Sequence, residues 1–579
     1  MDPTRNVNDQ SDRKLDENYI YGRWGIYQTV QAAIVFYNIL PTAFQLLIGV
    51  FIGYRPAFQC LPRSEFENQT FNTNGSFIAY EKCHVRLENN YTSKDTASLI
   101  KYTACTNGYE YNLDKESTFV TEMDLVCDQA YLGELVQTLI MTGQLVGAAF
   151  ASSLSDKYGR KTVHLTSHLL TLALGIGVAF SPNYMVLAIL KFILGVVQQG
   201  MVMTNVVLGL ELFAEDKRFY SEAISLICWA TGLVIMSGIA YLMRDYSWRY
   251  LQIVMTCFSL FSLLQYWVQD ESLRWLSANG KKFAVEKVVR KVARWNKVNY
   301  EDLKNIVDKR MASTEQNTQK VDDKETTTEN TQQGKLAVEK YSFVTILRNR
   351  RIFLISLIIW FTWVTNTFTY FGMTLTSTSL AGNRFLNFFL SSFAEYIAVI
   401  FEYSMLRCLG RRTISIVFHA ACAVSLASAT LLSQFSGGNS NLQMASVVTT
   451  FVGKAAITGS FSILFLFTPE LYPTNLRNAG IGFSSTFSRL GALISPFVGT
   501  LAEEVPWAPG TIFSGMCFIV TLLILKVPET RGVELPQNLK EVEELYNKNR
   551  RSWQRDKSRK LYKAVHLKLQ GDSEDNNLE

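Results

Sequence analysis

Charged residues are nearly absent from about a dozen stretches of this 579-residue chain, and they crowd into the segments between those stretches. Each stretch is roughly 20 residues long, the length that an α-helix needs to cross about 30 Å of hydrocarbon. The stretches are too long and too evenly apolar for barrel strands, which alternate apolar and polar residues over about ten positions. Only helices and closed barrels satisfy all backbone groups in lipid, so the sequence predicts a helical membrane protein.

The sequence also lacks the patterns of an enzyme or an ATP-driven pump. No glycine-rich Walker loop is present, which argues against direct ATP hydrolysis. The five histidines and nine cysteines show no metal-ligand spacing, and no nucleophile–base set stands out. We therefore expect no enzymatic activity, no metal site and no resident cofactor. We interpret the net charge of +6 as a topological bias and not as nucleic acid binding.

The apolar stretches predict twelve transmembrane helices, in an all-α fold of two six-helix halves. The expected spans are 26–53, 132–152, 163–181, 184–212, 221–243, 249–268, 352–375, 386–406, 413–433, 442–467, 480–501 and 510–527. The expected parts of the chain are a cytosolic N-terminus at 1–25, an N-terminal half at 26–268, a cytosolic central loop at 269–351, a C-terminal half at 352–527 and a cytosolic tail at 528–579. The first 25 residues are polar and charged, so we expect no cleavable signal peptide there.

Lysine and arginine in the short loops predict the orientation. If the N-terminus is cytosolic, the short inner loops hold nine of these residues and the short outer loops hold three. The inner set is Lys157, Arg160, Lys161, Lys217, Arg218, Arg407, Arg411, Arg412 and Arg477, and the outer set is Arg244, Arg249 and Arg384. By the positive-inside rule, both termini are expected in the cytosol.

The segment 54–131, between the first two spans, is then a long extracellular loop. It contains four of the nine cysteines, Cys60, Cys83, Cys105 and Cys127. An even number of cysteines in an extracellular loop indicates two disulfides, with three possible connectivities. Three N-glycosylation sequons begin at Asn68, Asn74 and Asn90. Their position in this loop supports the orientation and predicts a glycoprotein of the secretory route.

Three short patterns at the inner ends of the first six spans recur in the same order in the last six. The pairs are Asp156–Lys161 with Arg407–Arg412, Glu211 and Arg218 with Glu470 and Arg477, and Glu271 with Glu529, at offsets of 251, 259 and 258 residues. Such ordered matches indicate a duplicated six-helix unit, as in transporters whose halves rock about a central site.

These inner charges have two interpretations. In the first, acid–base pairs latch the halves together in one state and release them in the other. In the second, they only set the topology. The candidate latch residues are Asp156, Gly159, Arg160, Glu211, Arg218, Arg411, Glu470 and Arg477.

Ionisable residues inside the membrane are costly and are candidates for function. Glu395 and Arg489 lie near the middle of their spans, Lys454 lies about halfway along its own, and Lys191 lies in the outer half of a span. In one interpretation, Arg489 binds a substrate carboxylate and Glu395 holds a cationic end. In the other, Glu395 and Arg489 pair with each other and only hold two helices together.

Polar and aromatic residues accompany these charges and suit a small organic ion. Trp363, Asn366 and Tyr370 share one helix face, because they follow a spacing of three and seven residues. Tyr37 and Gln198 lie near the centres of two spans of the first half. Aromatic faces attract organic ammonium groups, and arginine binds carboxylates in a bidentate manner. For the aromatic residues among these five, packing is the alternative interpretation.

The stretch Ser152-Ser-Leu-Ser-Asp-Lys-Tyr-Gly-Arg-Lys161 resembles the signature of the major facilitator superfamily, although Ser152 and Lys157 replace its usual glycine and arginine. Other stretches resemble the organic cation, carnitine and organic anion transporters of solute carrier family 22. They are Thr121–Cys127, Glu271–Leu276 and Pro469–Asn478. The stretch around Arg489 is most similar to the carnitine or zwitterion branch.

The resemblance implies a secondary-active transporter of small organic cations or zwitterions, such as carnitine-like or quaternary ammonium compounds. It also implies alternating access and a multi-pass location in the plasma membrane. An organic anion exchanger of the same fold is one alternative, and a ligand sensor that does not transport is another. Coupling to sodium or protons is possible, with Glu470 as a candidate, and the oligomeric state stays open.

Overall fold

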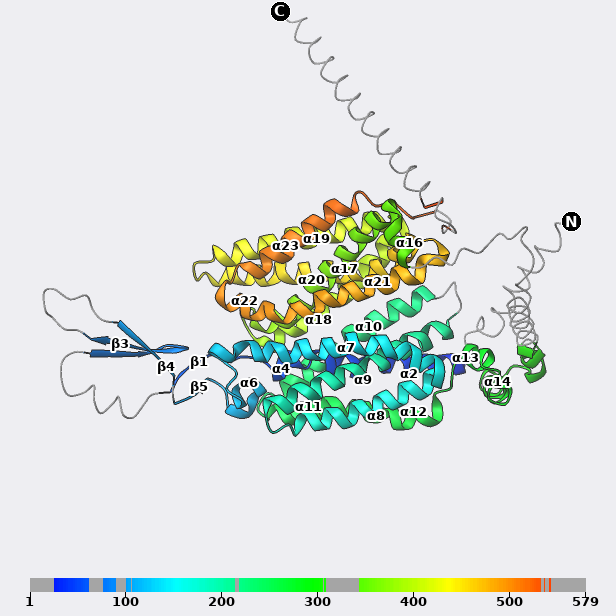
Figure 1. Ribbon diagram of the computed structural model, residues 1–579, viewed down its shortest axis with the longest axis horizontal. Helices are drawn as coiled ribbons and strands as arrows, with labels where there is room; N and C mark the ends of the chain where they lie inside the picture. The colour runs from blue at the N-terminus through cyan, green and yellow to red at the C-terminus, as the bar shows by residue number, and fades with distance from the viewer. Residues whose placement is uncertain are drawn as a thin grey trace, which may run out of the picture. The chain divides into compact units, whose positions relative to one another are not determined.

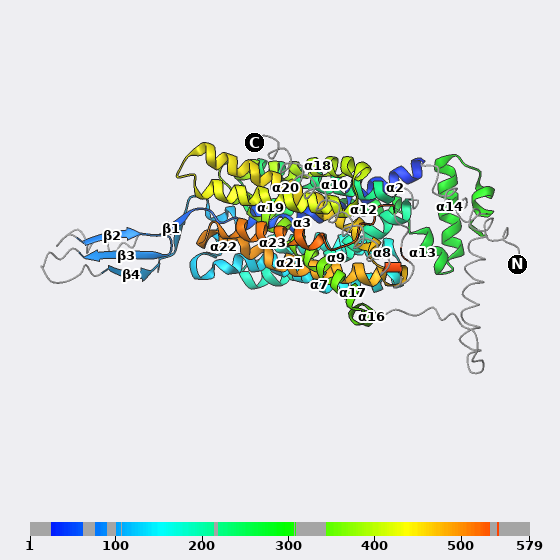
Figure 2. The same cartoon turned by 90° about the horizontal axis from the view of Figure 1, so that it is seen from above.

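The structure is a computed structural model (Figure 1, Figure 2). It describes residues 25–61, 76–89, 100–105, 107–213, 218–305, 307–308, 343–532, 536 and 541–542. The three predicted glycosylation sites, Asn68, Asn74 and Asn90, lie outside the described residues. The chain forms two compact units. The first contains 1–334, 374–393 and 496–504, and the second contains 335–373, 394–495 and 505–579.

The helices of the first unit match the predicted spans of the N-terminal half. They are α2 (Ile26–Tyr37), α3 (Ile39–Leu47), α4 (Gly49–Ile52), α7 (Ala130–Tyr158), α8 (Arg160–Ala179), α9 (Tyr184–Leu212), α10 (Arg218–Leu242), α11 (Trp248–Cys257) and α12 (Ser262–Val268). The first span is one continuous helix over Ile26–Ile52, because Asn38 and Ile48, which separate α2, α3 and α4, keep right-handed helical backbone angles. Polar caps start several helices; the Asn183 side chain, for example, accepts a hydrogen bond from the backbone N–H of Val186 at the start of α9.

Small residues let α7 and α9 lie side by side (Figure 1). A methyl group added at Gly143 would meet the carbonyl oxygen of Phe192, and one added at Gly195 would meet that of Ile140. Helices in lipid associate through close packing of this kind, because the lipid tails are as apolar as the helices themselves.

The segment between the first two spans forms two small antiparallel sheets. Strand β1 (Phe58–Cys60) pairs with β5 (Tyr109–Tyr111). Strand β3 (His84–Asn89) lies between β2 (Ser76–Tyr80) and β4 (Ile100–Ala104), as Figure 2 shows. Cys60 is bonded to Cys105 and Cys83 to Cys127, so two disulfides form, in one of the three connectivities that the sequence leaves open.

The predicted central loop contains a helical part that docks on the first span. Helix α13 (Leu273–Ala278) is followed by α14 (Lys282–Asn296), whose apolar side packs with Tyr27 of α2. The Asn296 carboxamide accepts a hydrogen bond from the backbone N–H of Tyr27 at 3.0 Å and donates one to Gln28 at 2.8 Å. Buried valines of α14 account for its attachment through the hydrophobic effect.

The second unit carries the corresponding helices of the C-terminal half. They are α16 (Phe343–Arg348), α17 (Arg350–Thr376), α18 (Arg384–Cys408), α19 (Arg411–Gln434), α20 (Ser440–Glu470), α21 (Thr474–Ile494) and α23 (Ala508–Ile524). The C-terminal end of α17, the N-terminal part of α18, and α22 (Val498–Glu504) belong to the first unit.

Ten helices in the described residues are long and apolar enough to cross a membrane. They coincide with the first ten predicted spans. The eleventh predicted span, 480–501, is covered by α21, a short 3-10 turn and α22, and the twelfth by the shorter apolar helix α23.

Candidate functional site

Glu395, on α18, lies between a lysine and a tyrosine from two other helices. The Tyr370 hydroxyl, from α17, donates a hydrogen bond to Glu395 Oε1 at 2.8 Å. The Lys454 Nζ, from α20, forms an ion pair with the same oxygen at 3.2 Å. Both charged side chains are almost fully buried, at 2% and 1% exposure. The three residues therefore form one buried cluster that joins three helices of the second unit.

The lysine ammonium also lies on the tyrosine ring. Lys454 Nζ is 3.3 Å from the centroid of the Tyr370 ring and 3.4 Å from the Tyr370 carbonyl oxygen. A carboxylate, an aromatic face and a carbonyl thus surround one cation. In a medium of low dielectric constant these interactions are much stronger than in water, and each charge is compensated by its neighbour.

Arg489, on α21, does not pair with Glu395, so the predicted alternative of a Glu395–Arg489 pair is wrong. Glu395 is occupied by Lys454 instead, which reaches it from a different helix. Arg489 is partly buried, and among the described residues it has no carboxylate within ion-pair distance. Two residues further on, Gly491 packs against the α17 backbone at Val364 and Phe368. The second unit thus places one uncompensated guanidinium on a helix that touches α17.

Trp363 and Asn366 face other helices and do not touch Glu395. The Trp363 indole N–H donates to Thr468 Oγ1 at 3.0 Å, and its ring packs on those of Phe461 and Phe465. Asn366 Nδ2 lies 3.0 Å from Nε2 of His419 on α19. Of the three residues predicted to share a face, only Tyr370 joins the charged cluster. A binding role of Trp363 and Asn366 stays a prediction.

Asn366 belongs to a triad that both units contain. In the second unit, His419 Nδ1 lies 3.0 Å from Ser460 Oγ on α20. In the first unit, Asn38 Nδ2 lies 2.8 Å from His164 Nε2, and His164 Nδ1 lies 2.9 Å from Thr204 Oγ1. The same atoms therefore connect the first, third and fourth helices of each half, which supports the duplication that the sequence predicts.

The charged cluster has a neutral counterpart in the first unit. Gln198 Nε2, on α9, donates to the carbonyl oxygen of Thr42 at 2.7 Å, and Gln198 Oε1 accepts from Gln144 Nε2, on α7, at 3.2 Å. Lys454 follows Gln198 by 256 residues, the offset that separates Ser460 from Thr204. Position 198, predicted to bind substrate, therefore corresponds to position 454.

The offsets of the other two members agree. Glu395 follows Gln144 by 251 residues, the offset between Arg407 and Asp156. Tyr370 follows Thr42 by 328 residues, the offset between Asn366 and Asn38. The two clusters thus occupy equivalent places, with two glutamines in one and a lysine–glutamate pair in the other.

Tyr37, the remaining predicted binding residue, is engaged within the first unit. Its hydroxyl donates to the carbonyl oxygen of Phe258 at 2.9 Å, and its ring lies 4.5 Å from that of Phe261. These contacts connect the first and sixth helices of the half, and a binding role of Tyr37 stays a prediction.

At the predicted cytosolic ends, a glutamate that follows the sixth helix of each half caps the N-terminus of the third helix. Glu271 Oε1 accepts from the backbone N–H of Arg160 at 2.9 Å and of Lys161 at 3.2 Å. Gly159 separates α7 from α8 with a φ of +100°, and a side chain there would meet the Glu271 carboxylate. A carboxylate at a helix N-terminus is stabilised by the backbone N–H groups and the helix dipole. Asp156, one turn earlier, forms an ion pair with Arg160 at 2.8 Å.

The second unit repeats this capping arrangement. Glu529 accepts from the backbone N–H groups of Arg412 and Thr413 at the start of α19, each at 3.3 Å. Of the other predicted latch residues, Arg411 forms an ion pair with Glu470 at 3.4 Å, and Arg477 donates to the carbonyl oxygen of Pro469 at 3.0 Å. All of these contacts lie within one unit, so a latch between the halves stays a prediction.

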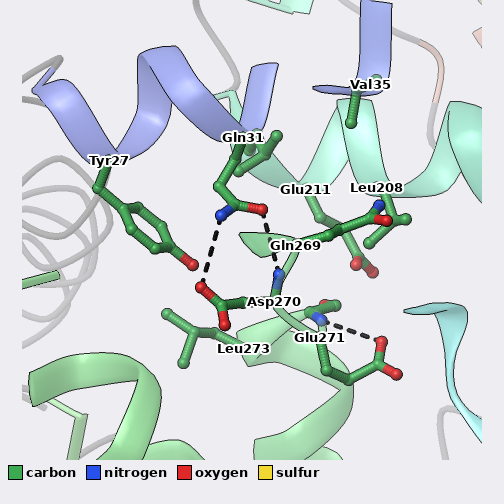
Figure 3. Close-up of a pocket in the computed structure, with 11 residues that line it drawn as sticks. Tyr27, Gln31, Val35, Leu208, Glu211, Gln269, Asp270, Glu271 and Leu273 are labelled. Atoms are coloured by element: carbon green, nitrogen blue, oxygen red, sulfur yellow. Dashed lines mark hydrogen bonds between the residues drawn. The ribbon is translucent and has the colours of Figure 1, made fainter. Parts of the chain in front are cut away.

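Glu211, another latch candidate, lines a small pocket in the first unit (Figure 3). The pocket holds about 40 Å³ of space between the ends of α2, α9 and α12. Asp270 and Glu271 also line it, and Asp270 is paired with Lys291 at 2.6 Å. Glu211 Oε2 is buried and has no hydrogen-bond partner among the described residues. The side chain of Arg218, its predicted companion, lies outside the described residues.

Near its end, the segment between the first two spans is bonded to α11. Glu122 accepts a hydrogen bond from Trp248 Nε1 at 2.6 Å and pairs with Arg249 at 2.6 Å. The Tyr111 hydroxyl donates to Asp124 Oδ1 at 3.1 Å. Burial raises the pKa of Tyr111, and the nearby Asp124 carboxylate raises it further, so this phenol stays a donor at neutral pH.

Sequence reasoning missed two sets of residues. It placed Lys454 near mid-membrane but did not connect it with Glu395, and it did not consider Gln144. It also found Glu271 and Glu529 only as repeated motifs and not as helix caps. The offsets between the repeated loop motifs also hold inside the spans. Applying them there would have aligned Gln144 and Gln198 with Glu395 and Lys454.

Comparison with known proteins agrees with this architecture. A family model described as "Sugar (and other) transporter" matches residues 75–545. The chain is 28% identical to an organic cation transporter-like protein of Drosophila melanogaster, over 92% of this chain and 93% of that protein. It is 29% identical to organic anion transporter 3 of Mus musculus, over 95% of this chain and 98% of that protein.

Among solved structures, the fold is similar to that of the xylose transporter XylE of E. coli in a partially occluded inward open conformation. The TM-score is 0.55 at 13% identity, over 87% of this chain and 100% of that one. A likeness at this identity concerns the fold alone. Because the family model spans most of the sequence, the chain belongs to the sugar (and other) transporter family of the major facilitator superfamily, whose members are transporters and not enzymes, and its homologues include organic cation and organic anion transporters.

Proposed function

We propose that the chain is a secondary-active transporter of small organic ions that carry a carboxylate, working by alternating access. The observation that carries this proposal is how three ionisable side chains of the second unit, Glu395, Lys454 and Arg489, are paired. Lys454 compensates Glu395, whereas Arg489 has no carboxylate partner among the described residues. Arg489 is therefore the member of this set that can bind an anionic substrate group.

The pairing of these three groups indicates which class of substrate is favoured. Organic anions and carboxylate-bearing zwitterions, such as carnitine, offer the group that Arg489 binds well. Simple organic cations gain the least, because the carboxylate that would attract them is already paired. The relatives are named for organic cations in some cases and organic anions in others, so their names are compatible with either charge. A carnitine-like substrate rests on the resemblance of the sequence around Arg489.

Uptake measurements with three labelled probes test the proposal. Cells expressing the chain are compared for hippurate, carnitine and tetraethylammonium, and we expect the two carboxylates to enter faster than tetraethylammonium. Arg489→Gln should lower uptake of both carboxylates by about tenfold or more, because a charged hydrogen bond contributes about 1.5–3 kcal/mol. Arg489→Lys, which keeps the charge but loses the bidentate geometry, should retain part of it.

Surface biotinylation of each variant controls for expression. Equal uptake of all three probes with and without Arg489 would contradict the proposal. Binding of the probes without counterflow in proteoliposomes would instead indicate a ligand sensor.

The proposal includes a location in the plasma membrane with both termini in the cytosol. The distribution of lysine and arginine, the disulfides and the three sequons support this orientation. Glycosidase treatment and epitope accessibility in intact cells test it. Coupling to sodium or protons is a further part of the proposal, with Glu470 as its candidate, and uptake in sodium-free medium and across a pH gradient measures it.

A further inference from the structure

The ammonium of Lys454 occupies a place that has the chemistry of an organic-cation site. Glu395 supplies a carboxylate at 3.2 Å, the Tyr370 ring supplies a face at 3.3 Å, and the Tyr370 carbonyl oxygen lies at 3.4 Å. Aromatic faces and carboxylates are the groups by which proteins bind alkylammonium ions. The difference here is that the cation is attached to the chain itself.

Helix packing alone does not require charges at this place. In the first unit the equivalent positions hold Gln198 and Gln144, and these neutral side chains connect the three equivalent helices through hydrogen bonds. A buried ion pair has a large desolvation cost, so uncharged residues often do equally well where only packing matters. The lysine–glutamate pair therefore has a role other than joining helices.

We propose that Lys454 determines the charge specificity of the transporter by acting as a tethered cation. Its ammonium fills the subsite formed by Glu395 and Tyr370, excludes small organic cations from that subsite, and leaves Arg489 as the uncompensated charge. This inference rests on the proposed transport function, because it concerns which ions are accepted. It predicts that shortening the lysine opens an organic-cation site.

Two substitutions separate the effect of the space from that of the charge. Lys454→Ala removes the ammonium together with the alkyl chain, and the space that it leaves has the shape of propylammonium. Lys454→Met removes the charge but keeps a chain of similar volume, so the subsite stays filled. Lys454→Ala/Glu395→Gln opens the space without the carboxylate.

The first readout is uptake of labelled tetramethylammonium, corrected for surface protein. We expect uptake to rise at least about tenfold in Lys454→Ala, which corresponds to about 1.4 kcal/mol of binding. It should stay at the wild-type level in Lys454→Met and in Lys454→Ala/Glu395→Gln. If Lys454→Ala reaches the cell surface but takes up tetramethylammonium no faster than Lys454→Met, the inference is overturned.

The second readout is independent of transport. Purified Lys454→Ala should be stabilised against heat by propylammonium and not by propanol, and neither compound should affect the wild type. If Lys454→Ala cannot be purified on its own, propylammonium added during extraction should restore it. Failure of the amine to stabilise or restore the variant refutes the tethered cation.

The two readouts distinguish this inference from the proposed function. If no ion is transported by the wild type or any variant, the proposed function fails, whereas stabilisation of Lys454→Ala by propylammonium still decides whether the site exists. If the carboxylates are transported but the amine has no effect, only the tethered cation fails.

Discussion

Removing the charge of Glu395 should destabilise the protein more than removing both charges of the cluster. In Glu395→Gln, Lys454 stays buried at 1% exposure and loses its carboxylate. Breaking a buried ion pair from one side costs about 3–5 kcal/mol, because the remaining charge is uncompensated. We therefore expect a loss of this size in the free energy of unfolding.

The double variant Glu395→Gln/Lys454→Gln should recover most of that loss. It copies the arrangement of Gln144 and Gln198, which connect the equivalent helices of the first unit without any charge. Tyr370→Phe serves as a matched control, since it removes one hydrogen bond to the carboxylate and leaves the pair intact, at a cost of about 1.5–3 kcal/mol.

Thermal unfolding of the purified proteins in detergent, together with the surface amount of each variant, measures these effects as a double-mutant cycle. The expected order of stability is wild type, then the double variant, then Glu395→Gln. If Glu395→Gln is as stable as the wild type, the ion pair does not form in the membrane. If the double variant is as unstable as Glu395→Gln, the comparison between the two halves is wrong.

Two further predictions concern other parts of the molecule. Glu271→Gln should lower the free energy of unfolding by about 0.3–2 kcal/mol, because the N-terminus of α8 loses its carboxylate. Gly159→Ala should lower it by about 1–3 kcal/mol, because it adds a side chain at positive φ against that carboxylate. Equal melting temperatures for the wild type and both variants would contradict these predictions. Cys60→Ser and Cys60→Ser/Cys105→Ser should be equally destabilised, by about 2–5 kcal/mol, as measured by thermal unfolding, because each removes the same disulfide. A larger loss in the double variant would indicate a different pairing.

The helices of the fold could be predicted from the sequence because each span is a local property of the chain. A run of about 20 apolar residues is recognisable without knowing its neighbours. The helical part of the central loop was also predictable, since α14 repeats buried valines at helical spacing.

The partner of Glu395 could not be predicted in this way. Depth in the membrane placed Glu395 and Arg489 at similar levels, but depth says nothing of which way each helix is rotated about its own axis. Lys454 reaches Glu395 from a third helix, 59 residues further along the chain, and its rotation decides the pairing. Pairings of this kind follow from the packing of several helices and not from the pattern within one.

The duplication supplies the information that single spans lack. If both halves descend from one six-helix unit, equivalent positions start with equivalent contacts, and a contact retained in one half predicts its counterpart in the other. The Asn–His–hydroxyl triad follows this rule, because Asn38 and Asn366 contact their histidines through the same atoms. The cluster around Lys454 keeps the contacts of its counterpart around Gln198, but its side chains are charged where those of the counterpart are neutral. The shared hydrogen bonds account for helix packing in both halves, and we propose that the charges of the second-half cluster select the substrates.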